Sequence, residues 1–214
     1  MEILFEDAQI AVVVKPAGMA SQQTPTGNDC VTALREHTGG EVYPVHRLDT
    51  AARGVMVYAK TKRSAAFLSN EIAEGRFEKE YEALVHGCPQ PPEGVMEDWL
   101  FKDKNNKSYV VQRERRGVKK ALLDYRVETT FETARYGTLS LVRVTLRTGR
   151  THQIRVQFAS RKWPLLGDGK YGARDNAPFL GLASVRLAFR HPVTGEATAF
   201  GWEPGFAEKM KEER

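Results

Sequence analysis

Cysteine is scarce in this chain, since only Cys30 and Cys88 occur in 214 residues and they form no Cys-x-x-Cys pair. Neither a disulfide framework nor a cysteine-based zinc site is therefore expected. Long apolar runs are also absent, and the first residues carry the acids Glu2, Glu6 and Asp7 where a secretory leader would be basic and then apolar. These absences predict a cytoplasmic protein that is neither exported nor embedded in a membrane.

The composition sets the scale of the fold. Hydrophobic residues make up 41% of the 214 residues, which is enough to bury a substantial core. We expect one domain spanning residues 1–214, without internal repeats. The formal net charge of +5 is compatible with an anionic partner, but ordinary soluble surfaces also carry such a surplus. Charge alone does not identify RNA as that partner.

Local patterns predict a mixture of strands and helices. Asn28-Asp29 and Thr61 are expected to cap two helices, over residues 30–35 and from residue 62 to just before Gly75. A final short helix is expected after Pro204. This order favours an α+β fold with a largely antiparallel sheet. Strands are predicted at residues 3–5, 10–14, 54–59, 77–85, 122–130, 139–146 and 183–189.

Two polar clusters stand out against this background. His46-Arg47-Leu48-Asp49 comes just before the apolar run at 54–59; alone, it is also consistent with an Arg47–Asp49 ion pair or with a turn started by Asp49. Downstream, residues 148–155 read Thr-Gly-Arg-Thr-His-Gln-Ile-Arg, and Thr151 is the expected helix N-cap. Together, the clusters supply a carboxylate and the cations that would hold it against a polyanion.

The chain resembles the RluA-type RNA pseudouridine synthases, because three motifs of that family occur in the right order and spacing. Further matches flank the three motifs, so that the resemblance covers nearly the whole chain. The three are His46-Arg47-Leu48-Asp49, Lys79-Glu80-Tyr81-Glu82-Ala83 and Gly149-Arg150-Thr151-His152-Gln153-Ile154-Arg155. The flanking matches are Ile3 to Asp7, Val13 to Gly18, Leu166-Gly167-Asp168 with Tyr171-Gly172, and Leu187-Ala188-Phe189 before His191-Pro192.

The resemblance implies the pseudouridine synthase fold, a long bent sheet with flanking helices and a central cleft. It implies an isomerase acting on specific uridines of structured RNA, either ribosomal or transfer RNA, with no cofactor and no metal. Because the catalytic pattern starts within the first residues, we expect no N-terminal S4-like domain. A monomer is the expected oligomeric state.

The resemblance also assigns the catalytic residues. Asp49 matches the essential carboxylate, which acts at the ribose or the base as a nucleophile or a stabilising group. Arg155 matches the active-site arginine, which would keep that carboxylate charged and aligned. Tyr81 matches the tyrosine that stacks on the uracil, although a tyrosine on a strand is also compatible with a plain core position.

Four further residues are predicted to bind the substrate. Arg47 would fill the space left by a flipped uridine, or would only pair with Asp49. Leu182 matches the apolar residue beneath the base, and is also compatible with plain core. Arg150 fits either a phosphate contact or a simple turn. His152 fits either a substrate contact or a hydrogen-bonded structural histidine, and His46 is expected to be a structural histidine as well.

Three other features have plainer interpretations. Asp168, between two glycines, is expected to form a turn rather than to act as an acid. The basic segment 102–120 fits either a solvated hairpin or an RNA contact. Two departures from the family pattern occur, Ala52-Arg53 in place of Thr-Ser and Ala183 in place of a histidine; they put the loop hydrogen bonds, the RNA contacts and the polarity of the pocket in doubt.

Two other functions compete with this interpretation. A non-catalytic RNA-binding protein would keep the family's cleft without turnover, but the joint presence of Asp49, Tyr81 and Arg155 argues against it. A hydrolase built on Asp and His would need a nucleophile, and neither a Ser or Cys motif nor a metal cluster is evident in the sequence.

Overall fold

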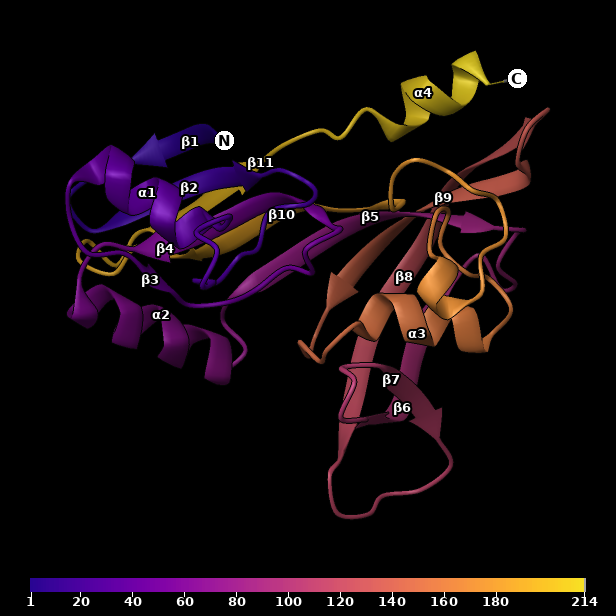
Figure 1. Ribbon diagram of the computed structural model, residues 1–214. Coiled ribbons are helices and arrows are strands. Elements are labelled where there is room, and N and C mark those ends of the chain that lie inside the picture. Colours follow the sequence, from indigo (N-terminus) through magenta and orange to yellow (C-terminus); the bar gives the residue numbers. More distant parts are fainter. Residues whose placement is uncertain (214) are drawn as a thin grey trace. The chain divides into compact units, whose positions relative to one another are not determined.

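The computed structural model describes residues 1–213 and divides into two compact units, each described separately below (Figure 1). The first unit comprises Met1–Lys79 and Ala183–Pro204. The second comprises Glu80–Leu182 and the segment that begins at Gly205. No helix within residues 1–213 is both long and apolar enough to cross a membrane.

The first unit is a sheet covered by helices. Its strands follow the order β1-β2-β4-β10, with β11 added on β10 and β3 on β4. β2 is antiparallel to both of its neighbours, whereas β4 and β10 run parallel. The elements are β1 (Glu2–Glu6), β2 (Ile10–Lys15), α1 (Cys30–Thr38), β3 (Tyr43–Pro44), β4 (Arg53–Ala59), α2 (Lys62–Ala73), β10 (Leu182–Arg190, in this unit from Ala183) and β11 (Ala197–Gly201).

Alternating side chains of this sheet form the core. Val12 and Val55 are fully buried, and they pack with Leu68 of α2 and Leu187 of β10 in one hydrophobic cluster. Both predicted caps are confirmed: Asp29 accepts a hydrogen bond from the Thr32 N–H at 2.7 Å, and Thr61 accepts one from the Ser64 N–H at 3.1 Å.

The second unit is an antiparallel sheet. The strand order is β5-β9-β8-β6-β7, α3 packs against β6 and β7, and α4 contacts β8. The elements are β5 (Glu78–His86, in this unit from Glu80), β6 (Glu93–Lys102), β7 (Ser108–Val111), β8 (Val118–Thr133), β9 (Gly137–Leu146), α3 (Gln153–Ser160), the short 3-10 helix η1 (Gly169–Tyr171) and α4 (Phe206–Glu212).

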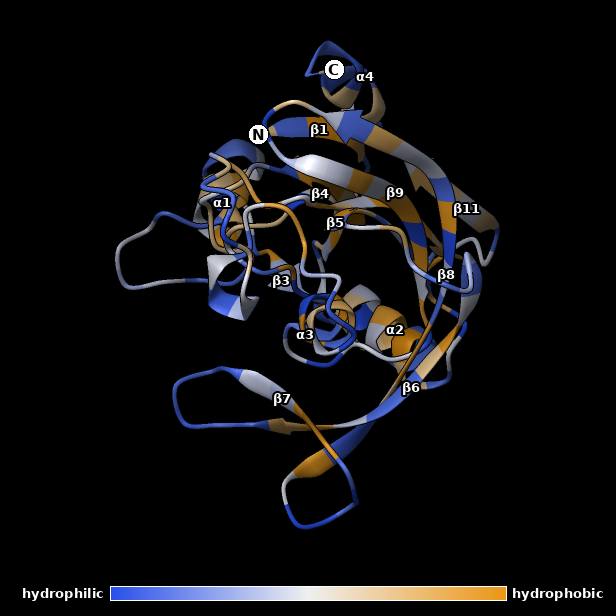
Figure 2. Ribbon diagram, turned by 90° about the vertical axis from the view of Figure 1, so that its right-hand side faces the viewer, coloured by the Kyte–Doolittle hydropathy of each residue, from blue (hydrophilic) through white to orange (hydrophobic). Residues whose placement is uncertain are grey.

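The predicted α+β class with a mostly antiparallel sheet is confirmed. Four strands were not predicted individually: β3, β11, and the pair β6 and β7, which carry part of the basic segment. β6, β7 and the start of β8 form hairpins whose connecting loops are hydrophilic, as the blue loops near β7 in Figure 2 show. The expected final helix begins at Phe206, two residues after Pro204, and its N-cap Gly205 takes the left-handed φ of 69°.

Candidate active site

Asp49 lies in the first unit, on the loop that joins β3 to β4. The backbone on both sides of it is fixed: the Asp49 carbonyl accepts the Ala52 N–H at 3.0 Å, and the Thr50 carbonyl accepts the Gly18 N–H at 2.8 Å. The Leu48 carbonyl accepts the Ser21 hydroxyl at 3.0 Å. The carboxylate is half-buried on a loop whose neighbouring carbonyls are hydrogen-bonded, so its position is set by the fold.

The strongest support of this loop is Lys15, at the end of β2. Its side chain is 0% exposed, and its ammonium donates to the carbonyls of Pro16 at 2.8 Å, Met19 at 2.8 Å and Thr50 at 3.2 Å. Burial lowers the pKa of Lys15 to about 8, and the charge of Asp49 acts in the opposite direction. Sequence reasoning missed this residue, although a lysine that ends a fully apolar strand was a usable signal.

His46 has a structural position in the same loop. Its Nε2 accepts the Val57 N–H at 3.1 Å, and its ring lies 5.5 Å from that of Phe77. Burial, together with the charge of Lys79, lowers the pKa of His46 to about 3. A neutral histidine that accepts from a backbone amide is consistent with the structural interpretation. The neighbouring Arg47 is exposed, on the surface beside Asp49.

The first departure from the family pattern has a structural explanation. Ala52 is buried, and Arg53 donates from Nη2 to the Pro204 carbonyl at 2.8 Å while its guanidinium lies 5.4 Å from the centre of the Trp202 ring. The additional cation is therefore used within the first unit. The second departure, Ala183, is fully buried at the start of β10.

Tyr81 and Leu182 belong to the second unit. Tyr81 is 5% exposed on β5, opposite Val144 of β9. Leu182 is also 5% exposed and follows Gly181, whose carbonyl accepts the Leu84 N–H of β5 at 2.9 Å. A Cβ at Gly181 would come within 2.9 Å of the Leu84 Cβ, so a glycine is needed for this close approach.

Arg155 lies on α3 and is 7% exposed. Its Nε donates to Asp168 Oδ2 at 2.7 Å and its Nη2 to Asp168 Oδ1 at 2.8 Å. The guanidinium carbon lies 5.2 Å from the centre of the Tyr171 ring. Asp168 also makes the predicted turn, since its N–H donates to the Leu165 carbonyl and its carbonyl accepts the Tyr171 N–H, both at 3.0 Å.

The predicted N-cap of α3 is wrong. The residue at that position is His152, not Thr151, and it takes the left-handed φ of 53° without a side-chain cap. Instead, Oε1 of Gln153 accepts the Arg150 N–H at 3.0 Å, and the Thr151 carbonyl accepts the Ser108 hydroxyl at 2.6 Å. The tight reversal at His152 directs Thr151 toward β7, and the Gln153 side chain closes the turn that leads into the helix.

His152 and Arg150 are anchored on opposite sides of this reversal. Nδ1 of His152 lies 2.8 Å from the Tyr171 hydroxyl, and Nε of Arg150 donates to the Lys120 carbonyl at 2.9 Å. The structure thus joins Arg155 and His152 through Tyr171. Of the predicted site residues, Asp49 and Arg47 belong to the first unit, and Tyr81, Arg150, His152, Arg155 and Leu182 to the second.

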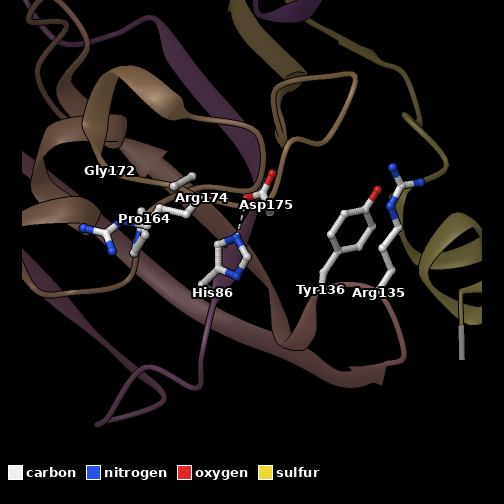
Figure 3. A pocket seen from close by; sticks show the side chains of 8 residues that line it. His86, Arg135, Tyr136, Pro164, Gly172, Arg174 and Asp175 are labelled. Carbon is white, nitrogen blue, oxygen red and sulfur yellow. Dashed lines mark hydrogen bonds and ion pairs between the residues drawn. The ribbon is translucent and has the colours of Figure 1, made fainter.

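A pocket of about 360 Å³ in the second unit contains none of the predicted site residues. Figure 3 shows His86 pointing at Asp175, and Nε2 of His86 lies 2.6 Å from Asp175 Oδ2. Burial would raise the pKa of Asp175, but hydrogen bonds from the Ala177 N–H, His86 and the Gly167 N–H lower it below its ordinary value. These bonds identify Asp175 as an anchor of the loop that carries Asp168.

Within residues 1–213, no three side chains of His, Cys, Asp or Glu gather closely enough to hold a metal ion. The Lys15 ammonium is paired with backbone carbonyls, and the Arg155 guanidinium with the Asp168 carboxylate.

Comparison with known proteins identifies the family. The family model described as RNA pseudouridylate synthase matches residues 9–160, which include Asp49, Tyr81 and Arg155. The chain belongs to the RluA-type RNA pseudouridine synthases. Enzymes of this family are isomerases that act on RNA.

The similarity to curated relatives extends over nearly the whole chain. An uncharacterized RNA pseudouridine synthase of Aquifex aeolicus is 35% identical over 94% of this chain and 68% of its own length. The dual-specificity RNA pseudouridine synthase RluA of Escherichia coli is 32% identical over 92% of this chain and 90% of its own length.

A solved structure agrees on the fold. The human RNA pseudouridylate synthase domain containing 1 aligns with a TM-score of 0.79 over 98% of this chain and 85% of that chain, at 22% identity. At this identity the likeness supports the fold alone, and it confirms the pseudouridine synthase fold.

Proposed function

We propose that this enzyme isomerises particular uridines of structured ribosomal or transfer RNA, and that Asp49 is its essential carboxylate. The observation that carries this proposal is the family match over residues 9–160, combined with the rigid loop on which Asp49 sits. The relatives support the choice of RNA, because they include a ribosomal large subunit pseudouridine synthase D of Zymomonas mobilis, 34% identical over 95% of this chain and 69% of its own length.

The reaction breaks the bond from uracil N1 to ribose C1′, turns the base while it remains bound, and joins C5 to C1′. C5 loses its hydrogen and N1 gains one, so the composition of the RNA does not change. Asp49 acts at the ribose or the base as a nucleophile or a stabilising group. The carboxylate must be ionised for either role.

Two residues of the second unit complete the proposed catalytic set. Arg155 keeps the Asp49 carboxylate charged and aligned through a charge-assisted hydrogen bond. Tyr81 stacks on the uracil, and its hydroxyl assists proton transfer. Leu182 forms the apolar floor beneath the base. The burial of Arg155, Tyr81 and Leu182 supports these roles, since a partly dry site strengthens each interaction.

The target uridine must leave its stack to reach Asp49, at a cost of a few kcal/mol in paired RNA. The exposed side chain of Arg47, next to Asp49, would fill the vacated space with its planar guanidinium. Arg150 contacts a phosphate, and His152 contacts the RNA beside it. Both lie before α3, next to the strands of the basic segment.

The basic segment is proposed as the main RNA contact outside the cleft. Aromatic rings accompany its cations: Lys107 Nζ lies 5.7 Å from the ring centre of the exposed Tyr109, and the Arg115 guanidinium 5.5 Å from that of the half-buried Phe101. Cations beside accessible rings bind both phosphates and unstacked bases. The cations of the segment are Lys102, Lys104, Lys107, Arg113, Arg115, Arg116, Lys119 and Lys120.

The remaining parts of the proposal concern the state of the protein. We propose that residues 1–214 work as a single catalytic domain, as a monomer in the cytoplasm, and without a metal or cofactor.

The test is release of tritium from RNA labelled at uracil C5, with ribosomal and transfer RNA as substrates. The unmodified protein should release tritium, and Asp49→Asn should release none while binding RNA with similar affinity. Asp124→Asn is the matched control: it removes a carboxylate from an exposed ion pair with Arg147, at 2.6 Å, and should leave release unchanged. Equal release by Asp49→Asn and the unmodified protein would reject the role of Asp49.

A further inference from the structure

To hydrogen-bond a reacting carboxylate, the Arg155 guanidinium must be correctly oriented as well as charged. A guanidinium has donors along two edges, and only one edge can face a given carboxylate side-on. In the structure, the Nε–Nη2 edge of Arg155 faces Asp168. Nη1 lies on the other edge. Whatever holds the first edge therefore determines where the second edge points.

The contact with Asp168 fixes the plane of the guanidinium. The two side chains are 9% and 1% exposed, and they meet through two short hydrogen bonds of 2.7 and 2.8 Å. Such a bidentate pair allows neither a swing nor a rotation of the arginine head. Asp168 is itself fixed, because backbone hydrogen bonds to Leu165 and from Tyr171 and Ala173 hold its turn.

Tyr171 fixes the face of the same guanidinium. Its ring centre lies 5.2 Å from the Arg155 guanidinium carbon. The Tyr171 hydroxyl accepts the Ser108 N–H at 2.9 Å and lies 2.8 Å from Nδ1 of His152, so the ring cannot turn away. The Arg155 head is thereby held along one edge by Asp168 and across one face by Tyr171.

We propose that Asp168 and Tyr171 are positioning residues, which fix the orientation of the Arg155 guanidinium within the second unit and so set the edge that it presents for the reaction. The inference rests on the proposed catalytic role of Arg155. It gives Asp168 a purpose beyond the turn, because a turn alone requires neither a buried charge nor a bidentate partner on α3. The two residues act through Arg155 and do not touch the substrate.

The loop offers a matched control. Asp175 is another aspartate with a buried side chain, 4% exposed, in the same segment. It binds the Gly167 and Ala177 amides and His86, as Figure 3 shows for His86, and none of its hydrogen bonds reaches Arg155. Asp175→Asn thus weakens the loop without changing the partner of Arg155. Asp168→Asn changes that partner but keeps the size of the side chain.

The experiment measures single-turnover product formation with saturating RNA, together with RNA affinity, thermal unfolding and hydrogen exchange at the Arg155 Nε–H by NMR. Asp168→Asn should slow product formation on the order of 10²-fold, with RNA affinity unchanged and the slowly exchanging Nε–H signal lost. Asp175→Asn should lower the unfolding temperature, but keep both the signal and the rate. Equal slowing by Asp168→Asn and Asp175→Asn would show that only loop integrity matters and would overturn the proposal.

Two further readouts keep the test decisive. If Asp168→Asn does not fold, Tyr171→Leu keeps apolar packing but removes the ring, and should slow product formation about 10-fold with unchanged RNA affinity. In an Arg155→Lys background, Asp168→Asn should cause almost no further loss, whereas independent residues would lose another factor of about 10². A persistent Nε–H signal in Asp168→Asn would also refute the proposal. Absence of product with the unmodified protein would instead count against the proposed function.

Discussion

Lys15 supports the most quantitative prediction, because its ammonium is buried and joins the segment after β2 to the loop that carries Asp49. Lys15→Met keeps the length of the side chain and removes three hydrogen bonds, to Pro16, Met19 and Thr50. Leaving such acceptors unpaired costs about 1–3 kcal/mol each. The substitution also removes the buried charge of Lys15, whose lowered pKa corresponds to a destabilisation of about 3 kcal/mol that is thereby relieved. We expect a net destabilisation of about 3 kcal/mol at pH 7.

The pH dependence gives this prediction its sign. Burial lowers the pKa of Lys15 to about 8 from 10.5, so between these values the unfolded chain binds more protons than the folded one. The stability of the unmodified protein should therefore rise with pH across this window, relative to Lys15→Met, by up to about 3 kcal/mol. Below pH 8 the difference between the two proteins should be constant.

The assay is urea unfolding followed by tryptophan fluorescence at several pH values from 7 to above 10. Both proteins should carry Cys30→Ala, because burial raises the pKa of the Cys30 thiol and its titration would overlap. A stability difference that narrows as the pH rises would refute the reasoning. It would mean that the three carbonyl bonds stabilise the ammonium more than burial destabilises it.

Three other perturbations test separate parts of the account. Gly54→Ala should prevent stable folding of the first unit, seen as a large loss of unfolding temperature, because a Cβ there would lie 2.1 Å from the Ser184 carbonyl oxygen at a φ of +122°; a normal unfolding temperature would contradict this. Replacing Arg113, Arg115 and Arg116 with Gln should lower the slope of log affinity against log salt by about 0.7 for each RNA phosphate that is no longer neutralised; an unchanged slope would exclude these arginines from the RNA interface. Tyr81→Phe should retain RNA affinity in a filter-binding assay and slow product formation by about 10²-fold or more; an unchanged rate would remove the hydroxyl from the mechanism.

The sequence predicted best where the signal was local. Asp29 and Thr61 cap their helices as expected, because an N-cap depends on a side chain and an amide only three residues away. The prediction of Thr151 as an N-cap was wrong because this helix start does not depend on a local residue preference. The left-handed His152 and the side chain of Gln153 decide that helix start, and neither could be read from a residue preference.

Long-range partners were not predictable from local pattern. Asp168 was correctly expected to form a turn, but its bidentate pair with Arg155 joins two segments that only the fold brings together. Lys15 was seen only as part of a motif, since its partner at Thr50 is 35 residues away. The strand β11 lacks strongly apolar alternation and exists because it pairs with β10.

We propose that this enzyme converts uridine into pseudouridine through Asp49. The direct test is nucleoside analysis of RNA that has been incubated with the protein and fully digested. We expect pseudouridine to appear in the amount by which uridine declines, and Asp49→Asn to produce none. Pseudouridine formed equally by Asp49→Asn, or a loss of uridine without pseudouridine, would contradict it.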